Sequence, residues 1–219
     1  MASKRVVSIR VIRRISVYYE ALLKLDLPET TYVSSKRLEE MTGLSSNQVR
    51  QDFFTLGLTI GKQKKGYMVK KLMRELKRIL SIDRGAKIVV IGAGRIGQSF
   101  SAYRLFQGRN IQVEAMFDIN PDLVGTTIGK PGAEIPILSI DELEPFLKGH
   151  PEVEIALLAV PEEVAQELLD RLVSYGIKGV VNYAPRILRL PREAKGVQLI
   201  NDCICSAIYK IVYHRNHPQ

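Results

Sequence analysis

The chain has 219 residues, enough for two small domains, and 46% of them are hydrophobic, so each domain can form an apolar core. It contains no run of eighteen apolar residues, and no apolar stretch with a cleavage site follows its basic N-terminus, which disfavours a membrane or exported protein. The two cysteines, Cys203 and Cys205, lack the Cys and His pattern of a zinc site, and we expect them to be reduced in a cytoplasmic protein.

The positive net charge of +9 lies entirely in the first third of the chain. Residues 1–85 contain 18 Lys and Arg against 8 Asp and Glu, whereas residues 86–219 contain 14 against 15. Such asymmetry is typical of a polyanion-binding module joined to a module of nearly neutral charge. A generally basic surface is the alternative, but it does not explain so one-sided a division.

Three helices are expected first. Apolar residues recur at helical spacing over residues 9–23, a short helix is expected over 35–41, and Thr42-Gly43-Leu44 forms a turn. Ser45 can cap the next helix, and Gln48 completes a capping box. This pattern is typical of a helix-turn-helix, although any helical hairpin can share it. The outer residues of the last helix suit the DNA major groove: Ser46, Asn47, Arg50 and Gln51.

Two short β-prone runs, 58–60 and 67–69, flank a basic loop bounded by glycines over residues 61–66. A hairpin directly after a recognition helix is a wing, whose lysines can lie along phosphates. A solvated loop would explain the lysines but not their position. We therefore predict a winged helix-turn-helix domain over residues 1–80. Its expected DNA contacts are Ser46, Asn47, Gln48, Arg50, Gln51, Lys62, Lys64 and Lys65.

A glycine-rich turn opens the second domain. Residues 87–91 form a buried-strand run, and Gly92-Ala93-Gly94-Arg95-Ile96-Gly97 follows at once and leads into a helix. In a dinucleotide-binding turn the first glycine permits the bend, the second lets the backbone approach the pyrophosphate, and the third allows close helix packing. The N–H groups at the start of the helix can then bind phosphate. All six residues are expected to contact a dinucleotide.

The choice of dinucleotide depends on Asp118. It ends the second predicted strand, residues 113–117, and lies 21 positions beyond Gly97. A carboxylate there binds the adenosine ribose hydroxyls and repels a 2′-phosphate, which favours NAD(H) over NADP(H). The alternative is that Asp118 only begins the turn that continues to Pro121.

Strands and helices alternate through the rest of residues 81–200, as in a Rossmann doubly wound parallel sheet of the α/β class. Ligands bind outside the carboxyl ends of such strands. Residues expected beside the nicotinamide are therefore Val160, Pro161, Asn182 and Tyr183. The last segment, 201–219, contains a helix that is apolar on more than one face, and we expect it to pair with another subunit.

In this order the parts resemble the Rex family of bacterial redox-sensing transcriptional repressors over nearly the full length. The matching segments are Ile12-Arg13-Arg14 with Tyr18-Tyr19, residues 48–53, Gly66-Tyr67, residues 90–97, Phe117-Asp118 with Val124-Gly125, residues 178–185 and the C-terminal helix. The resemblance implies a homodimer that binds a palindromic operator when NADH is scarce. It also implies that NADH closes the dimer and releases the DNA, that NAD⁺ competes, that the C-terminal helix is swapped between subunits, and that Tyr103 lies near the nicotinamide.

The chain departs from the family at three places. Glu20 stands where the family has an arginine, and Asn201 followed by Asp202 stands where it has an aspartate leading into the swapped helix. The wing lacks a glycine that is usual in its tip. Because the arginine and the aspartate help to hold one conformational state in the family, we expect these departures to affect the redox response more than the binding of DNA or NAD(H).

Two other functions stay open beside a non-enzymatic repressor that senses the NADH/NAD ratio. A DNA-binding regulator could respond to another adenine-bearing ligand, such as a coenzyme A derivative, although Asp118 favours NAD(H). An NAD-dependent dehydrogenase would need an acid or base beside the nicotinamide, whereas His150, His214 and His217 fall in a loop and in the C-terminal tail.

Overall fold

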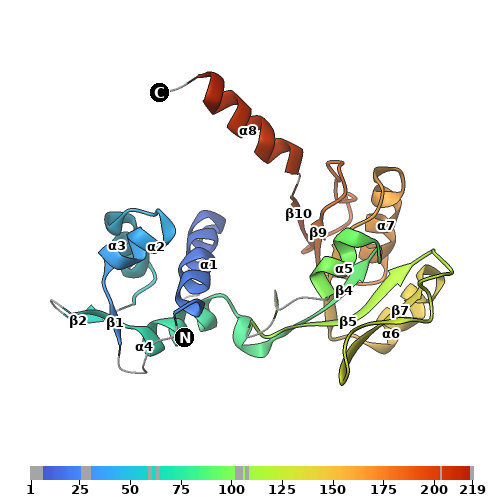
Figure 1. Cartoon of the computed structure of the whole chain (residues 1–219), viewed down its shortest axis with the longest axis horizontal. Coiled ribbons are helices and arrows are strands. Elements are labelled where there is room, and N and C mark those ends of the chain that lie inside the picture. Colours follow the sequence, from blue (N-terminus) through green and yellow to red (C-terminus); the bar gives the residue numbers. More distant parts are fainter. Residues whose placement is uncertain are drawn as a thin grey trace. The chain divides into compact units, whose positions relative to one another are not determined.

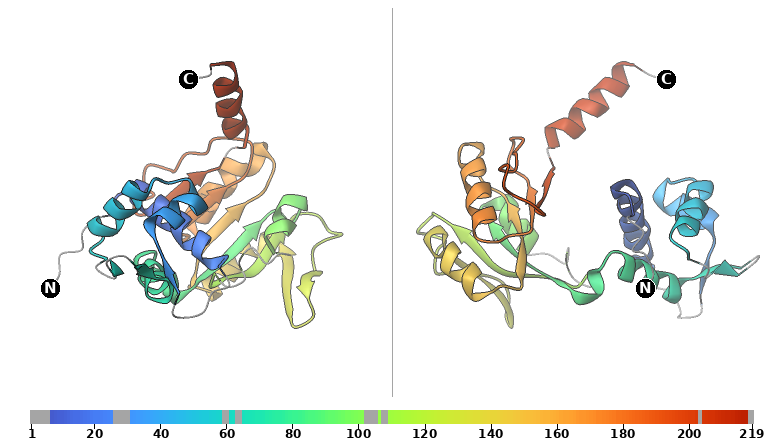
Figure 2. Two further views of the ribbon diagram at one scale, coloured as in Figure 1. Left: turned by 60° about the vertical axis from the view of Figure 1, so that its left-hand side comes forward. Right: turned by 180° about the vertical axis from the view of Figure 1, so that it is seen from behind.

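The computed structural model describes residues 7–25, 31–58, 61–62, 65–101, 106, 109–202 and 204–217. The chain divides into two compact units, Met1–Arg84 and Gly85–Gln219, and each is considered by itself (Figures 1 and 2). Within the residues described, no helix has both the length and the apolar character needed to cross a membrane.

The N-terminal unit combines helices with a small antiparallel sheet. Its helical elements are α1 (Ile9–Leu23), α2 (Ser35–Thr42), α3 (Ser46–Thr55), α4 (Val69–Ile79) and the 3-10 turn η1 (Ile82–Arg84). Its strands are β1 (Tyr32–Val33), β2 (Gly61–Lys62) and β3 (Gly66–Met68), in the order β1-β3-β2. Serines 8, 34 and 45 cap the first three helices.

The hairpin after α3 differs from the sequence prediction. Its first strand includes Gly61 and Lys62, which the sequence pattern assigns to the loop, whereas the preceding Leu58 is a buried core residue outside any strand. Residues 59 and 60, the rest of that predicted strand, lie outside the described residues. Strand β1, which the sequence pattern does not predict, pairs with β3 over two residues and so widens the hairpin into a sheet.

The core of this unit lies where the helices meet. One apolar stripe of α1, including Ile15 and Leu22, packs with α3 and with the inner faces of α2 and α4. Phe53 of α3 makes edge-to-face contacts with two tyrosines, at centroid distances of 5.4 Å to Tyr18 and 4.9 Å to Tyr67. Aromatic edge-to-face pairs add to the stabilisation from burial alone. Phe53 thereby fixes α3 against both α1 and the hairpin.

The second unit is built on one seven-stranded sheet. Its strands are β4 (Ala86–Ile91), β5 (Ile111–Asp118), β6 (Thr127–Lys130), β7 (Ala133–Ser139), β8 (Val153–Leu158), β9 (Gly179–Asn182) and β10 (Gln198–Asn201). The order is β10-β9-β8-β4-β5-β7-β6, and every pair is parallel except β6 with β7. The predicted α/β class with a mostly parallel sheet is confirmed, and the β6–β7 hairpin is an addition that the sequence analysis missed.

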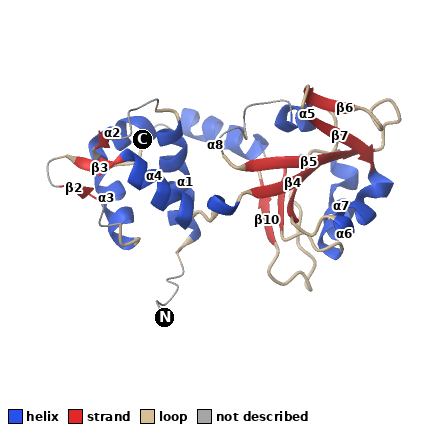
Figure 3. Cartoon of the chain, turned by 90° about the horizontal axis from the view of Figure 1, so that it is seen from below, coloured by secondary structure: helices blue, strands red, loops and turns tan. Residues whose placement is uncertain are grey.

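Helices cover both faces of this sheet (Figure 3). They are α5 (Arg95–Ser101), η2 (Ile140–Glu142) with α6 (Leu143–Gly149), and α7 (Glu162–Ser174), while α8 (Ile204–Asn216) follows β10. Val89 and Ile91 of β4 belong to the core under α6 and α7, whereas Ile88 and Val90 face the core that includes Phe100 of α5. A strand buried on both faces explains the unbroken apolar run that predicted it.

The C-terminal helix α8 projects away from the sheet at the end of β10 (Figure 2). Its described apolar side chains are exposed rather than packed: Ile208, Tyr209, Ile211, Val212 and Tyr213. The sequence prediction of apolar surface on this helix is therefore confirmed for the residues described.

Candidate functional site

Close packing requires Gly92 and Gly97 in the turn after β4, whereas Gly94 leaves its backbone open. Gly92 has a positive φ of 96°, and a Cβ there would lie 2.4 Å from the Ala159 carbonyl oxygen. A Cβ on Gly97 would lie 1.8 Å from the carbonyl oxygen of Gly92, so only glycine lets α5 pack this closely. A Cβ on Gly94 would meet nothing within 4 Å. The turn therefore leaves an open approach to the backbone at Gly94.

Asp118 lies at the end of β5, the strand beside β4, and is bonded to the glycine turn. Its Oδ2 accepts a hydrogen bond from the Ala93 N–H at 2.5 Å, and its Oδ1 accepts one from the Asn120 N–H at 2.8 Å. The second bond is the turn-forming role that is the alternative for Asp118, and it does not exclude the predicted role in ligand binding. A carboxylate offers about four acceptor positions, so Asp118 keeps capacity for a ligand.

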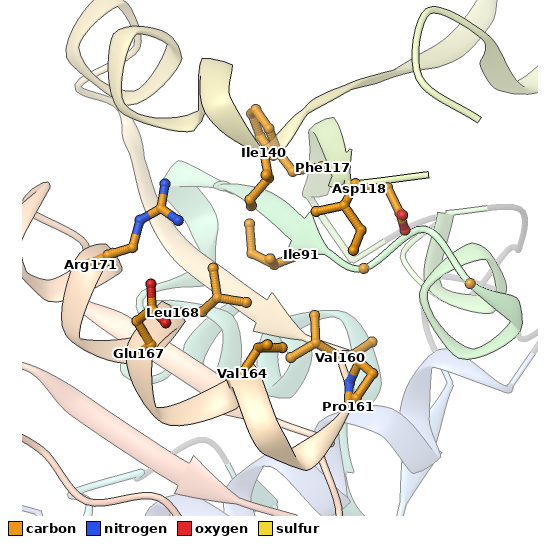
Figure 4. A pocket seen from close by; sticks show the side chains of 14 residues that line it. Ile91, Phe117, Asp118, Ile140, Val160, Pro161, Val164, Glu167, Leu168 and Arg171 are labelled. Atoms are coloured by element: carbon orange, nitrogen blue, oxygen red, sulfur yellow. The ribbon is translucent and has the colours of Figure 1, made fainter. Parts of the chain in front are cut away.

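A cavity of about 290 Å³ opens between the carboxyl ends of β4, β5 and β8 (Figure 4). Asp118 lies at one end of it, and Glu167 and Arg171 of α7 lie at the other. The side chains between them are mainly apolar and come from the strand ends, η2 and α7: Ile91, Phe117, Ile119, Ile140, Val160, Pro161, Val164 and Leu168. An apolar slot with a few polar groups at its ends suits a flat ring attached to a sugar.

The predicted turn and strand-end residues differ in how they meet this cavity. Gly92, Gly94, Val160 and Pro161 line it together with Asp118. Ala93 is buried, whereas the side chains of Arg95 and Ile96 are exposed. Sequence reasoning missed Glu167 and Arg171, because only the path of α7 beside β8 brings them to the cavity. Tyr103 lies outside the described residues.

Asn182 and Tyr183 are positioned by local contacts. The Asn182 amide nitrogen donates to the Arg186 carbonyl at 2.7 Å and to Asn201 Oδ1 at 2.9 Å, and its Oδ1 accepts from the Ala184 N–H. The Tyr183 ring packs on Phe100 at a centroid distance of 4.6 Å. Burial, and to a lesser extent the Asp202 carboxylate, raises the pKa of the Tyr183 phenol. Neither side chain lines the cavity of Figure 4.

Asn201, one of the departures noted above, has a structural role. Its Oδ1 accepts from the Leu188 N–H at 2.9 Å, and its Nδ2 donates to the Leu188 carbonyl at 3.2 Å. It also accepts from Asn182, so the two amides tie the loop after β9 to the end of β10. An aspartate at this position could not donate to the Leu188 carbonyl. A second departure, Glu20, lines a groove of about 440 Å³ beside α1 and the end of α2.

The predicted recognition helix α3 presents most of the predicted polar residues to solvent. Asn47, Arg50 and Gln51 are exposed, and Arg50 donates to Ser35 Oγ at 2.9 Å and to the Asn47 side chain. Ser46 is only half-buried, and its N–H is bound by the Glu39 carboxylate.

The predicted cap is confirmed, but the predicted capping box is wrong. Ser45 Oγ accepts from the Gln48 N–H at 3.2 Å. In the part of the chain that is described, however, the Gln48 amide nitrogen donates to Asp52 Oδ1 at 2.9 Å, and Gln48 Oε1 accepts no hydrogen bond from the Ser45 N–H. A hydrogen bond to a buried carboxylate is stronger than one from a solvated backbone N–H, which explains the orientation of Gln48.

Asp52 is the centre of a buried polar cluster that the sequence analysis did not assemble. Its side chain is only 2% exposed, and Arg14 binds both of its oxygens at 2.7 Å. The Tyr18 hydroxyl also donates to it, at 3.0 Å. Burial alone would raise the pKa of Asp52, but the hydrogen bonds from Arg14, Tyr18 and Gln48 hold that pKa below its usual value. The cluster locks α3 onto α1.

The basic hairpin is described only in part. Lys62 lies in β2 and Lys65 is exposed at the turn, whereas Lys64 lies outside the described residues. Gly66 has a positive φ of 86°, and a Cβ there would lie 2.4 Å from the Val33 carbonyl oxygen, so β1 and β3 can approach only through glycine. Among the residues described, no group of His, Cys, Asp and Glu side chains could hold a metal ion.

Family models match both units. A model described as a putative DNA-binding protein N-terminus matches residues 6–53, and one described as a CoA-binding domain matches residues 83–186. Curated relatives match the whole chain. The redox-sensing transcriptional repressor Rex of Clostridioides difficile is 36% identical over 213 residues, which is 97% of each chain. That of Caldanaerobacter subterraneus is 33% identical over 219 residues, covering 100% of this chain and 94% of the relative.

Solved structures of RSP, a Rex-family repressor, have the same fold. RSP in complex with beta-NAD⁺ and operator DNA matches with a TM-score of 0.82 and 32% identity, covering 98% of this chain and 94% of that one. RSP in complex with beta-NADH matches with a TM-score of 0.79 and 31% identity, covering 98% and 96%. The matches therefore extend over both units.

Proposed function

The chain belongs to the Rex family of redox-sensing transcriptional repressors, and on that premise we propose a role for each of its parts. It is a regulator and not an enzyme, and it binds operator DNA and both NADH and NAD⁺. Residues 1–80 act as a winged helix-turn-helix on DNA, residues 81–200 hold the dinucleotide, and residues 201–219 join two copies. The place of action is the cytoplasm, where both ligands occur.

The dinucleotide lies across the carboxyl ends of β4, β5 and β8. The adenosine fills the apolar cavity, its ribose hydroxyls donate to Asp118, and the pyrophosphate lies over the open backbone at Gly94. Asp118 repels a 2′-phosphate, so NAD(H) is bound in preference to NADP(H). The residues assigned to this ligand are Gly92, Ala93, Gly94, Arg95, Ile96, Gly97, Tyr103, Asp118, Val160, Pro161, Asn182 and Tyr183.

Asn182 is assigned a role in shaping the loop after β9. Both N–H groups and the oxygen of its side chain are bonded within the chain, so it acts by holding the Tyr183 loop in place at the nicotinamide end. Tyr183 and Tyr103 are the residues assigned to the nicotinamide itself.

The N-terminal unit docks on DNA through α3 and the basic hairpin. Asn47 and Gln51 can address adenine, and Arg50 can address guanine or a phosphate in the major groove. Ser46 and Gln48 support the N-terminal turn of α3 at the groove, while the hairpin lysines 62, 64 and 65 lie along phosphates. The excess of basic residues in this third of the chain supplies the salt-dependent part of the affinity.

Two copies associate through α8, which is swapped between them. Its exposed apolar side chains need a cover, and a second copy can supply it with the same helix. The resulting two-fold symmetry requires a palindromic operator. NADH must bind one arrangement of the dimer better than the other, because a ligand with equal affinity for both would shift nothing.

The observation that carries this proposal is the contact between Asp118 and the glycine turn, in a chain whose other unit is strongly basic. The test is to titrate NADH and NAD⁺ separately against the chain bound to a labelled palindromic duplex. Release by NADH and not by NAD⁺ is expected. Indifference to both would exclude redox sensing while leaving DNA binding intact, and failure to bind any duplex at low salt would exclude the repressor itself.

A coenzyme A derivative is a second candidate ligand, because the family model that matches residues 83–186 is described as CoA-binding. Coenzyme A carries a phosphate on its adenosine ribose, which the Asp118 carboxylate would oppose. We therefore expect coenzyme A to displace NADH only weakly. Displacement at equal or lower concentration would favour the second candidate.

A further inference from the structure

The recognition helix α3 carries an aromatic side chain that the contacts described so far do not use. Phe54 is 86% exposed, whereas its neighbour Phe53 is 1% exposed. Among the large hydrophobic side chains that the structure describes, Phe54 has the largest exposed fraction. Single exposed apolar residues are common on protein surfaces, so its position on the helix decides whether it has a role.

Phe54 lies on the face of α3 that points away from the core. Val49, Asp52 and Phe53 are buried on the opposite face. Residues three, four and seven positions apart lie along one stripe of an α-helix. Asn47, Arg50 and Gln51, which precede Phe54 by seven, four and three residues, therefore share its stripe, and all three are exposed. The stripe proposed to enter the major groove thus ends in an apolar ring.

We propose that Phe54 contacts the 5-methyl group of a thymine in the major groove and so selects a T·A base pair in each half of the operator. The inference rests on the proposed function, since it takes DNA as the partner of α3. Of the groups on the major-groove edges, the thymine methyl is the apolar one, and a phenyl ring suits it. Binding to DNA would remove the exposed ring from water. Contacts made by Arg50 and Asn47 alone would leave the ring exposed.

The same surface fits DNA better than a protein partner. Phe54 is flanked along α3 by an arginine and two amide side chains, and it belongs to the part of the chain with 18 basic and 8 acidic residues. Interfaces between proteins are depleted of charge at their centres. A duplex offers both the negative charge that the surroundings of Phe54 require and the methyl group that its ring can cover.

Helix geometry also predicts which thymine is read. Seven residues at 1.5 Å per residue separate Phe54 from Asn47 by about 10 Å along α3. Base pairs are about 3.4 Å apart along each strand. The thymine should therefore lie about three base pairs from the base contacted by Asn47.

The test replaces thymine by deoxyuridine, which removes only the methyl group. Duplexes bound by the full-length chain are first selected from a random library, and each thymine of the selected site is then replaced in turn. We expect the affinity to fall about fourfold for each half-site at one thymine position, the effect of losing one buried methyl group. Phe54→Ala should bind the same duplex more weakly and be indifferent to that replacement, while Phe54→Leu should keep part of the discrimination.

Ile9→Ala provides the matched control, because Ile9 is also highly exposed in this unit but lies at the start of α1. It should retain the full sensitivity to deoxyuridine. Circular dichroism checks that each variant is folded, which truncation of an exposed ring should not prevent.

Several results would overturn the inference. One is that the wild-type chain binds its selected duplex equally well with deoxyuridine at every position. Another is that Phe54→Ala loses as much affinity on this replacement as the wild type does. In either case Phe54 reads no methyl group, while the proposed function stands. A Phe54→Ala variant that changes the oligomeric state but keeps the discrimination would assign the ring to a protein contact. A chain that selects no duplex at all overturns the proposed function and this inference together.

Discussion

Asp52 of the N-terminal unit and Asp118 of the second unit are both carboxylates beside a candidate site, but their surroundings differ. Asp52 accepts four hydrogen bonds, two from Arg14 and one each from Tyr18 and Gln48. Asp118 accepts two from backbone N–H groups and lies at one end of a cavity. Because a carboxylate has about four acceptor positions, Asp52 is saturated and can only position α3, whereas Asp118 can still bind a ligand.

The two sites are accordingly fixed by different physical means. In the N-terminal unit a buried charged cluster holds a helix whose outer face is polar. In the second unit the shape of the backbone forms the site, and glycine is required where strands and helix approach closest. Substitutions in the charged cluster should leave the dinucleotide site intact, and substitutions in the glycine turn should leave α3 in place.

The largest effect is expected from Gly97→Ala. The added Cβ would collide with the Gly92 carbonyl oxygen, so the turn must move away from β4. We expect NADH affinity to fall more than about 100-fold, because small displacements at a preorganised site have large effects. Fluorescence titration with NADH measures this. Gly149→Ala, where nothing lies within 4 Å and φ is not positive, should bind NADH like the wild type.

Asp52→Asn should destabilise the N-terminal unit by about 3 kcal/mol. It leaves the Arg14 guanidinium, which is 24% exposed, without its charged partner, and breaking a buried pair is costly. Denaturant unfolding gives the change, and operator affinity should fall while NADH binding persists. Glu40→Gln, which removes the exposed Arg37–Glu40 pair, should change stability by less than about 1 kcal/mol. Similar losses in both variants would refute the assigned role of Asp52.

Asp118→Asn should reduce NADH affinity about 10- to 100-fold and reduce the preference over NADPH. The amide keeps one acceptor but loses the charge that strengthens bonds to the ribose and repels a 2′-phosphate. Competition titrations with the two dinucleotides measure the change. An unchanged preference for NADH over NADPH would show that Asp118 does not bind the ribose.

Asn201→Asp should cost about 1 kcal/mol of stability in the second unit. The new carboxylate cannot donate to the Leu188 carbonyl, so one of the bonds that holds the loop after β9 is lost. Thermal unfolding should show a small decrease in midpoint. If the substitution instead strengthens the response to NADH without loss of stability, the family aspartate at this position matters more for that response than Asn201 does for stability.

The smallest effect is a dependence of stability on acid pH. Because hydrogen bonds lower the pKa of folded Asp52, its contribution is fully present above the unfolded pKa of about 3.9. It is lost progressively as the pH falls below that value and through the folded pKa. The unfolding free energy of the wild type should fall more steeply below about pH 4 than that of Asp52→Asn. Equal slopes would contradict the lowered pKa.

Much of the candidate site was predictable from local spacing. Gly92, Gly94 and Gly97 lie within six residues directly after a strand, and Asp118 ends the next strand at the spacing expected of a turn that binds NAD(H). The capped helix with its polar outer face is equally local, as is the division of charge between the two parts of the chain. These features depend on backbone conformation and helical or strand periodicity, which neighbouring residues determine.

Only the tertiary structure decided which distant residues meet. Arg14 and Asp52 are 38 positions apart and Asn182 and Asn201 are 19 apart, and no period in the sequence connects them. The far wall of the cavity, with Glu167 and Arg171, likewise depends on how α7 packs beside β8. Side-chain partners across such separations are set by the packing of whole elements, whereas a turn or a cap is set by the conformation of a few adjacent residues.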